Sequence, residues 1–529
     1  MNILGLHYGH DGAACIIKDG RLVSSISTER ITKKKKASGV THEVIDYVLE
    51  NANLKFDDID VIALSDYYRE NNFGTLDLYI DGKQVDSTSQ IVFENNVIHA
   101  EGKSRGRNIK VLVLPHHLCH CAAAYYTSDF KESWCFSLDS SGGAIEANSL
   151  IAKGVGNKLF AVNHPGLMIG EGYSSFTELC GIGHPLYKAG TMMGLASYGM
   201  PCKDVRDNID EYVKDSYFMT DDYGDFYYNL FMKWSKSKRK LENNESSKPE
   251  AIMLSASIQF LLERCVLDVV QNKIDNDNVL NLCLAGGTLL NCNANTYIAK
   301  KSRFKKIHHF PGCGDDGIAV GAALYANHHI YDQPREFYKT EDICYLGKKY
   351  KYEEPDYDVI AKMIANGKII AWFFGASECG PRALGNRSIL ADPRNFHNRE
   401  LINFIVKDRE WYRPFAPVVL EEHFAKWFEF EFPSPFMLYT AKVLQPKEIP
   451  AVTHIDGTAR FQTVTIDSNP PYYKLISSFY KLTGTPVLLN TSLNGNNQPI
   501  LETEDDALAY LAESNIDALV LNGRLLFKE

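Results

Sequence analysis

The sequence has no long hydrophobic run and no excess of basic residues. Its longest apolar stretches, such as residues 111–114 and 518–521, are far too short to cross a bilayer, so no membrane association is expected. Lys and Arg together number 56 against 66 Asp and Glu, a formal net charge of −10. Nucleic-acid carriers usually show a basic excess, so this balance argues against a nucleic-acid partner and leaves small anionic ligands open.

The chain also lacks a recognisable secretion signal and a disulfide pattern. The first residues, MNILGLHYGHDG, contain no basic segment followed by an apolar run. The 12 cysteines are scattered without a repeating framework, which indicates reduced thiols. We therefore expect a cytoplasmic protein.

Length and composition favour a globular chain of several domains. The 529 residues correspond to two to four domains at roughly 150 residues per domain. A hydrophobic content of 45% with 23% charged residues excludes a disordered or collagen-like chain. Near residues 333–352, Pro, charged residues and Tyr replace a Gly/Ala-rich helix that ends at Ala326. A domain boundary there divides the chain into residues 1–340 and 341–529.

Apolar runs that end in small residues predict an α/β fold. The predicted strands lie at residues 3–6, 13–17, 21–26, 135–138 and 279–284. Asp19-Gly20 between two of them predicts a hairpin turn. Because ligands of α/β folds bind at the carboxyl ends of strands, we expect the site at those ends. The polar segment 235–250 is expected to be an exposed loop or lid.

Two histidines stand four residues apart in LPHHLCHCAAAYY, a segment whose proline can open a helix. His116 and His120 would then share one helix face and could hold one metal ion. Asp139 in LDSSGG and Asp315 in PGCGDDGIAVGAAL are expected at strand ends, each before small residues, and could face the same cleft, with Asp316 as an alternative to Asp315. A His₂Asp₂ set without thiolate suits Fe(II), Mn(II) or Zn(II). The competing interpretation is that each Asp only caps a turn or helix.

Glycine-rich turns follow two of the predicted strands, at Ser140 to Gly143 and at Gly286-Gly287. Neither has a P-loop or G-x-G-x-x-G pattern. Their backbone amides could approach a phosphate closely, and tight packing of strand against helix is an equally supported alternative.

His10 and Asp11 lie in the loop after the first predicted strand. A His accepts a proton near neutral pH, and a desolvated carboxylate can do the same, so the pair is a candidate general base. A hydrogen-bonded loop pair without a catalytic role is the alternative.

Arginines gather in Gly/Pro-rich turns of the C-terminal part. GPRALGNRSILADPRN holds Arg382, Arg387 and Arg394, KDREWYRPFAP adds Lys407, Arg409 and Arg413, and THIDGTAR adds His454 and Arg460. In an acidic chain, this concentration favours a phosphate-bearing small molecule as ligand. For part of the set, pairing with Glu378, Asp392 or Asp408 is the alternative.

These segments resemble the NodU/CmcH-type O-carbamoyltransferases, the family of nodulation-factor, cephem and tobramycin carbamoyltransferases. The resemblance covers essentially the whole chain. It is carried by STERITKKKK, HHLCHCAAAYY, SLDSSGG, MGLASYG, AGGTLLNCNAN, GDDGIAVGAAL, GPRALGNRSILADPRN, KDREWYRPFAP, SPFM, THIDGTARFQTV and GTPVLLNTSLN.

The resemblance implies two α/β domains and a two-step reaction. Residues 1–340 would be similar to an actin-like (ASKHA-type) metal- and nucleotide-binding domain. Residues 341–529 would be similar to a YrdC-like domain, whose K-x-R and S-x-N pairs match Lys407-Arg409 and Ser492-Asn494. Carbamoyl phosphate and ATP would form carbamoyl-adenylate in the second domain. The carbamoyl group would then pass, at the metal site of the first domain, to a hydroxyl of a sugar, nucleoside or other natural product.

The resemblance also implies roles for individual residues. The metal, expected to be Fe(II) with Zn(II) or Mn(II) as alternatives, would be held by His116, His120, Asp139 and Asp315. His10 or Asp11 would deprotonate the acceptor hydroxyl. ATP, accompanied by Mg²⁺, and the adenylate would contact Lys35, Ser140, Gly142, Gly143, Gly286, Gly287 and Asn291. Carbamoyl phosphate and ATP would contact Arg382, Arg387, Lys407, Arg409, Arg460, Ser492 and Asn494, with Met437 as a pocket wall.

Two segments depart from the family pattern. Where family members often carry Glu-Gly-Lys before MGLA, this chain has Ala189-Gly190-Thr191, so a polar contact is lost there or is supplied by Lys188. Residues 217–250 match nothing recognisable, and acceptor specificity is expected in such a segment. Threonylcarbamoyl-type transfer to tRNA and a non-catalytic nucleotide-binding sensor are the alternative functions. The oligomeric state is open, a homodimer included.

Overall fold

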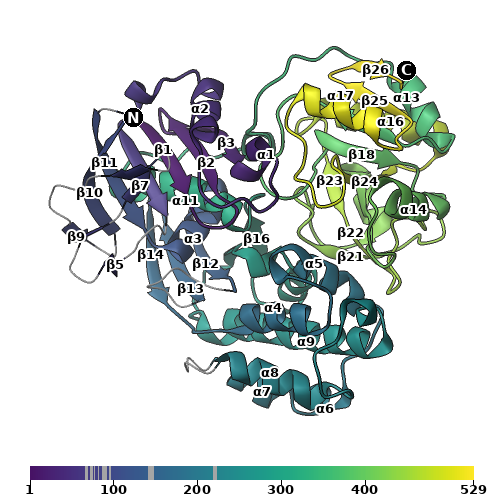
Figure 1. Ribbon diagram of the computed structural model, residues 1–529, viewed down its shortest axis with the longest axis horizontal. Helices are drawn as coiled ribbons and strands as arrows, with labels where there is room; N and C mark the ends of the chain where they lie inside the picture. The colour runs from purple at the N-terminus through teal and green to yellow at the C-terminus, as the bar shows by residue number, and fades with distance from the viewer. Residues whose placement is uncertain are drawn as a thin grey trace.

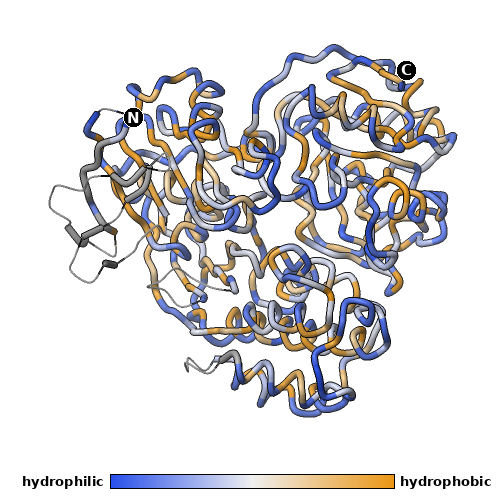
Figure 2. The backbone as a smooth tube through the Cα atoms, in the orientation of Figure 1, coloured by the Kyte–Doolittle hydropathy of each residue, from blue (hydrophilic) through white to orange (hydrophobic). Residues whose placement is uncertain are grey.

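The computed structural model describes residues 1–65, 107–140, 148–217 and 223–528, with the short segments 70–71, 75–76, 78–80, 83–85, 92–94 and 97–105. Figure 1 shows the N-terminal sheets at the left, a layer of helices below them and the C-terminal part at the right. Figure 2 shows hydrophobic residues concentrated along strands and inner helices, with hydrophilic residues on the outer connections. The α/β class predicted from the sequence is confirmed.

The first sheet contains the predicted N-terminal hairpin. In spatial order its strands are β3 (Arg21–Ser27), β2 (Ala13–Lys18), β1 (Asn2–His7), β4 (Val61–Ser65), β11 (Arg107–Leu114), β10 (Val97–Ser104) and β9 (Val92–Glu94). β2 and β3 are antiparallel, while β1, β4 and β11 are parallel. Asp19 and Gly20 both have positive φ, 50° and 84°, which is the geometry of the tight turn predicted there.

The second sheet repeats the order of the first five strands. It runs β14 (Lys158–Asn163), β13 (Ser149–Val155), β12 (Glu132–Leu138), β15 (Asn281–Ala285) and β16 (Lys306–His309). As in the first sheet, three consecutive antiparallel strands are followed by two parallel ones on the far side of the first. The first 330 residues therefore contain one topology twice, and β1 and β12 occupy equivalent central positions.

Two helices fill the space between these sheets. α3 (His116–Thr127) packs on the second sheet, and α11 (Ile318–Tyr325) packs on the first and against α3. Gly321 makes the close approach possible, because a Cβ at that position would lie 1.8 Å from the carbonyl oxygen of Cys119. Every residue of α3 is buried, so the histidines in its first two turns are enclosed by the two sheets.

A layer of helices is inserted between β14 and β15. Its main members are α4 (Ile169–Leu179), α5 (Pro185–Ala196), α8 (Tyr223–Trp234) and α9 (Pro249–Asp268). The predicted polar loop 235–250 lies in this layer. It is largely exposed, with a short 3₁₀ turn at Asn243–Glu245, and Pro249 begins α9 as a helix-opening proline.

The C-terminal sheet is built from residues 370–526. Its strands are β23 (Gln462–Val464), β19 (Ala416–Leu420), β24 (Val487–Ser492), β18 (Arg387–Ala391), β17 (Ile370–Phe373), β25 (Ala518–Leu521) and β26 (Arg524–Leu526). α13 (Tyr357–Ala365) and α16 (Pro470–Thr483) contribute to the apolar core on one face. The core on the other face includes residues of α17 (Glu504–Glu513).

In the described part of the chain, none of the helices combines the length and the apolar character needed to cross a bilayer.

Candidate active site

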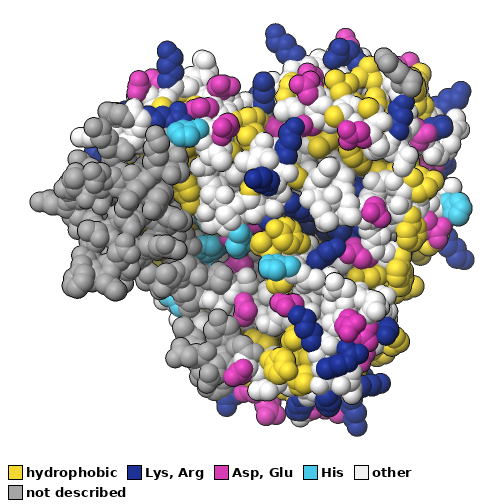
Figure 3. Space-filling view, in the orientation of Figure 1, with side chains coloured by type: hydrophobic (Ala, Val, Ile, Leu, Met, Phe, Trp, Pro, Cys, Tyr) yellow, Lys and Arg dark blue, Asp and Glu magenta, His cyan; other side chains and the backbone are white. Residues whose placement is uncertain are grey.

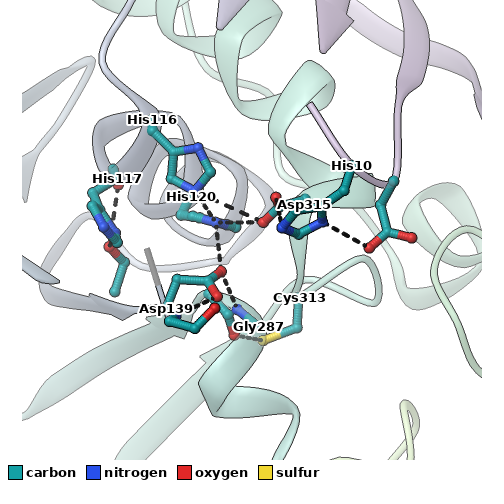
Figure 4. A network of polar contacts seen from close by, with 12 residues as sticks. His10, His116, His117, His120, Asp139, Gly287, Cys313 and Asp315 are labelled. Carbon is teal, nitrogen blue, oxygen red and sulfur yellow. Dashed lines mark hydrogen bonds and ion pairs between the residues drawn. The ribbon is translucent and has the colours of Figure 1, made fainter. Parts of the chain in front are cut away.

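Two histidines and two aspartates converge at the carboxyl ends of the strands of the second sheet. α3 begins after Pro115, so His116 and His120 lie one turn apart with their Nε2 atoms separated by 3.2 Å (Figure 4). Nε2 of His120 lies 3.5 Å from Oδ2 of Asp139, which follows β12, and 3.3 Å from Oδ1 of Asp315, in the turn after β16. The candidate ligand atoms of all four residues lie within 4.8 Å of one another, and all four residues are buried.

This donor set fits a divalent cation. Two imidazoles and two carboxylates without a thiolate suit Fe(II), Mn(II) or Zn(II). Among the described residues, Oδ1 of Asp315 is buried without a hydrogen-bond partner, which leaves a lone pair free for a ligand. Burial opposes ionisation of Asp315, but the charge of His116 and the nearby imidazoles of His120 and His7 outweigh it and hold its pKa well below the usual range. It is Asp315, not the alternative Asp316, that enters the cluster.

His10 lies at the edge of the cluster. Its Nε2 is 3.4 Å from Oδ2 of Asp315, and its Nδ1 is 3.3 Å from Oδ2 of Asp11. Its side chain is 40% exposed, so a molecule from solvent can reach the imidazole. The hydrogen bond with Asp11 and the neighbouring carboxylates raise the pKa of His10 to about 9, although burial opposes the shift. The loop thus offers an accessible imidazole beside the buried cluster.

Two residues around this loop were missed by the sequence analysis. Nζ of Lys36 lies 2.5 Å from Oδ2 of Asp11, and nothing in the run of four lysines had distinguished this residue. His7, the last residue of β1, places Nε2 3.7 Å from Oδ2 of Asp315. The only sequence signal for His7 was its position at the end of a predicted strand.

The two glycine-rich turns donate backbone hydrogen bonds to the side chain of Asp139. The backbone N–H of Ser140 donates to Oδ1 of Asp139 at 2.7 Å, and that of Gly287 donates to Oδ2 at 2.8 Å. Gly286 has φ 101°, and a Cβ there would lie 2.2 Å from the carbonyl oxygen of Leu138. The backbone amides of Ser140 and Gly287 therefore orient the carboxylate of Asp139.

Gly142, Gly143 and Asn291 were also expected to bind the nucleotide. Gly142 and Gly143 lie outside the described residues. Asn291 caps α10 (Cys292–Lys301) through its Oδ1 and exchanges hydrogen bonds with Gln259.

In the C-terminal part, the K-x-R and S-x-N motifs meet. Nζ of Lys407 donates to the carbonyl oxygen of Ser492, to that of Asn494 at 2.8 Å and to Oδ1 of Asn494 at 2.6 Å. The hydroxyl of Ser492 also donates to Oδ1 of Asn494, at 2.7 Å. Nε of Arg409 donates to Oδ1 of Asn403 at 2.7 Å, and its guanidinium lies over the ring of Phe415.

Further cations surround this motif pair. Burial lowers the pKa of Lys407 well below its usual range, and the charges of Arg409, Arg413 and Lys35 lower it further. Burial and the charge of Arg460 lower the pKa of Arg382 to about 9. Cations held this close together and out of water favour an anionic ligand. Figure 3 shows imidazole and cationic side chains gathered near the middle of the visible face, where the parts of the molecule meet.

One more cation reaches this region from the helical layer. Nζ of Lys188, on α5, lies 2.5 Å from Oε1 of Glu410, next to Arg409 in the K-x-R motif. Lys188 is the residue suggested as a substitute for the missing family lysine. Arg413 faces the same carboxylate, with NH1 3.7 Å from Oε2 of Glu410.

Arg387 and Met437 have surroundings of their own, apart from the cationic cluster formed by Lys407, Arg409, Arg413, Arg382 and Arg460. The fully buried guanidinium of Arg387 donates to the carbonyl oxygens of Phe374, Gly375 and Glu502 and lies 3.5 Å from the ring centroid of Phe373. Met437 is buried with φ 56°.

Comparison with known proteins agrees with these motifs. A relative, nodulation protein NolNO of Sinorhizobium fredii, is 33% identical over 98% of this chain and 79% of its own length. The 3'-hydroxymethylcephem-O-carbamoyltransferase of Amycolatopsis lactamdurans is 26% identical over 98% of both chains. A solved structure of full-length HypF in the phosphate- and nucleotide-bound form covers 63% of this chain and 47% of its own at 12% identity, and its TM-score of 0.33 is too low to support a conclusion.

The families described as carbamoyltransferase N-terminus and carbamoyltransferase C-terminus match residues 2–324 and 361–528. Together these matches span most of the chain, in the order expected from the sequence motifs. The protein therefore belongs to the carbamoyltransferase family and is a transferase enzyme.

Proposed function

We propose that this protein is an ATP-dependent O-carbamoyltransferase with two cooperating sites. Residues 341–529, as a YrdC-like domain, would activate carbamoyl phosphate with ATP. Residues 1–340, as an actin-like domain, would transfer the carbamoyl group to a hydroxyl of a small molecule. The family membership supports the overall reaction, and the two residue clusters support its division into two steps.

The observation that carries this proposal is the position of two consecutive lysines. Lys36 is paired with Asp11, beside His10 and the His/Asp cluster. The charge of Lys35 lowers the pKa of Lys407, and the charges of Arg413 and Lys188 in turn help to lower the pKa of Lys35 itself, after burial. The segment 35–36 therefore borders both clusters. An intermediate made at one cluster would pass to the other along this segment.

The activating step needs a site for several phosphate groups. Carbamoyl phosphate and water would give carbamate and inorganic phosphate. A carbamate oxygen would then attack the α-phosphorus of ATP and expel pyrophosphate, leaving carbamoyl-adenylate. Lys407, Arg409 and Arg460 would bind the phosphate oxygens of carbamoyl phosphate and of ATP with its Mg²⁺, while Ser492 and Asn494 supply neutral hydrogen bonds.

The transfer step needs a base and a stabilised leaving group. The acceptor oxygen would form a bond to the carbamoyl carbon, AMP would leave, and the hydroxyl proton would pass to Asp11 or to the neutral form of His10. A divalent cation held by His116, His120 and the two aspartates, with Fe(II) as the expected ion, would supply Lewis acidity toward the departing phosphate. Lys36 keeps Asp11 ionised, and Asp11 in turn orients the His10 ring.

The acceptor is proposed to be a hydroxyl of a sugar, nucleoside or natural product. The relative named as a hydroxymethylcephem O-carbamoyltransferase supports a small-molecule alcohol. The exposed edge of His10 supports an acceptor that enters from solvent. The helical layer that contains segment 235–250 is the proposed place for acceptor selection.

The proposal is tested by incubating the purified full-length protein with ATP, Mg²⁺ and carbamoyl phosphate and without an acceptor. Mass spectrometry should detect carbamoyl-AMP and pyrophosphate that depend on carbamoyl phosphate. Pyrophosphate release without dependence on carbamoyl phosphate, or no carbamoyl-AMP from folded protein that binds ATP, would contradict the activating step.

A further inference from the structure

His7 is held in one orientation by the neighbouring strand. It is the last residue of β1 and is paired in register with Ser65, the last residue of β4. Nδ1 of His7 lies 2.7 Å from the hydroxyl oxygen of Ser65, and the two side chains are 1% and 0% exposed. A ring anchored through Nδ1 must point Nε2 in a fixed direction. In this protein that direction is toward Asp315, at 3.7 Å from Oδ2.

The two oxygens of Asp315 have different neighbours. Oδ1 faces the pair of histidines on α3, at 3.3 Å from Nε2 of His120 and 3.8 Å from Nε2 of His116. Oδ2 faces the two histidines of the first loop, at 3.4 Å from Nε2 of His10 and 3.7 Å from Nε2 of His7. One oxygen of the Asp315 carboxylate therefore faces the candidate metal cluster, and the other faces the loop that would act on the acceptor.

Electrostatics selects one tautomer for His7. If the Ser65 hydroxyl donates to Nδ1, Nε2 carries the hydrogen and presents a donor to the Asp315 carboxylate. The other tautomer would place a lone pair against the carboxylate. Among the described residues, Nε2 of His7 has no hydrogen-bond partner. A small movement of Oδ2 of Asp315 toward Nε2 would form a hydrogen bond and satisfy this buried polar atom.

The His7 ring also supports the loop that carries His10. A Cβ at Gly9 would lie 2.7 Å from Nε2 of His7 and 2.8 Å from Cε1. Only glycine allows the loop to close this tightly over the ring.

We propose that His7 is a positioning residue for Asp315: its Nε2–H, oriented by Ser65, holds Oδ2 so that Oδ1 stays turned toward a cation bound with His116 and His120. Partners of metal-binding carboxylates fix their orientation, and their loss typically weakens metal affinity by about 10–100-fold. The inference rests on the metal site of the proposed function. It adds a residue from the first sheet to a cluster otherwise built on α3 and the second sheet.

The test is Co(II) binding by full-length protein, in competition with a coloured chelator, for the wild type and the variants H7F, H7Q and S65A. H7F fills the space of the ring without a donor and should weaken Co(II) binding about 10–100-fold and shift the visible absorption bands of the bound ion. H7Q retains an N–H donor and should lose less affinity. S65A removes the hydroxyl that fixes the tautomer of His7, so it should also weaken Co(II) binding.

His117 gives a matched control. It is also buried, with Nδ1 2.8 Å from the hydroxyl oxygen of Ser137, and its ring centroid lies 5.1 Å from that of His116. H117F should bind Co(II) within about 3-fold of the wild type and with the same spectrum, because it removes a buried histidine–serine pair of the second sheet and leaves the His7–Ser65 pair in place.

Unchanged Co(II) affinity and spectrum in folded H7F would overturn the positioning role while leaving the metal site intact. If H7F does not fold, unchanged affinity and spectrum in S65A would overturn it instead. A wild type that binds no Co(II) would remove the proposed metal site and this inference with it.

Discussion

The ammonium group of Lys36 lies 2.5 Å from Oδ2 of Asp11, and both groups are largely removed from solvent. Burial would raise the pKa of Asp11, but hydrogen bonds from His10 and Lys36 and the charge of Lys36 outweigh it and lower the pKa. Burial would lower the pKa of Lys36, but the charge of Asp11 outweighs it and raises the pKa. The pair connects segment 33–36 to the loop that presents His10.

Removing one partner of this pair should destabilise the protein, because the other charge is left uncompensated. We expect K36M to lower the free energy of unfolding by about 3 kcal/mol. In a double-mutant cycle with D11N, measured by urea unfolding, the coupling should be constant between about pH 5 and pH 8, below the pKa of about 9 of His10, which is hydrogen-bonded to Asp11.

The pH range follows from the signs of the two shifts. The contribution of Asp11, whose pKa is lowered, is present above its unfolded value of about 3.9 and is lost as pH falls through the folded pKa. The contribution of Lys36, whose pKa is raised, is present below about 10.4 and is lost as pH rises through the folded pKa. A coupling near zero, or one that changes steadily across this range, would contradict the account.

Arg387 should contribute to stability. Its guanidinium donates to the carbonyl oxygens of Phe374, Gly375 and Glu502, which would lose these bonds in R387M. We expect R387M to lower the free energy of unfolding by about 3–5 kcal/mol while the KM for ATP of the folded fraction changes less than about 3-fold. R409M should instead raise the KM for ATP and change the free energy of unfolding little. A rise in KM for R387M comparable to that of R409M would assign the arginine to ligand binding instead.

Lys188 should assist ATP binding from the N-terminal part of the chain. Its ammonium pairs with Glu410 beside the cationic cluster, so its loss leaves that carboxylate with only the more distant Arg413 and better able to repel phosphate groups. We expect K188M to raise the KM for ATP about 10-fold in the activating reaction. Lys203, whose side chain is 84% exposed, provides the control, and K203M should be unchanged. Equal KM values for K188M and the wild type would exclude Lys188 from the site.

Removing the divalent metal should separate the two steps. Protein treated with a chelator, freed of it and resupplied with Mg²⁺ alone should form carbamoyl-AMP within about 3-fold of the untreated rate, because the cationic cluster contains none of the four candidate ligands. It should transfer no carbamoyl group to a pool of sugars and nucleosides until Fe(II) is restored without oxygen. Loss of carbamoyl-AMP formation in the chelated protein would contradict separate sites.

Much of the N-terminal architecture could be predicted because its signals are local. The Asp19-Gly20 turn was marked by residue type, and the spacing of His116 and His120 follows from one helical turn. Asp139 and Asp315 could be grouped with them because residues after buried strands of one sheet lie at the same edge. The duplicated sheet order was not predicted, since strand pairing depends on contacts far apart in the chain.

Other site residues carried no local signal. His7 is a single histidine at a strand end, and its role depends on Ser65, 58 positions away. Lys36 was indistinguishable from its neighbours in a lysine run until the fold placed Asp11 beside it. Arg382 and Arg387 share one motif, but only the packing of the chain shows that the guanidinium of Arg387 is occupied by backbone carbonyls.

The most direct test of the two-site account compares H120A with S492E in the presence of ATP, Mg²⁺, carbamoyl phosphate and pooled acceptors. S492E places a like charge beside the bound phosphates and should form no carbamoyl-AMP. H120A leaves the cationic cluster intact and should release pyrophosphate and accumulate carbamoyl-AMP, but carbamoylate no acceptor. Equal loss of carbamoyl-AMP in both variants, with both folded, would contradict the division of the reaction between two sites.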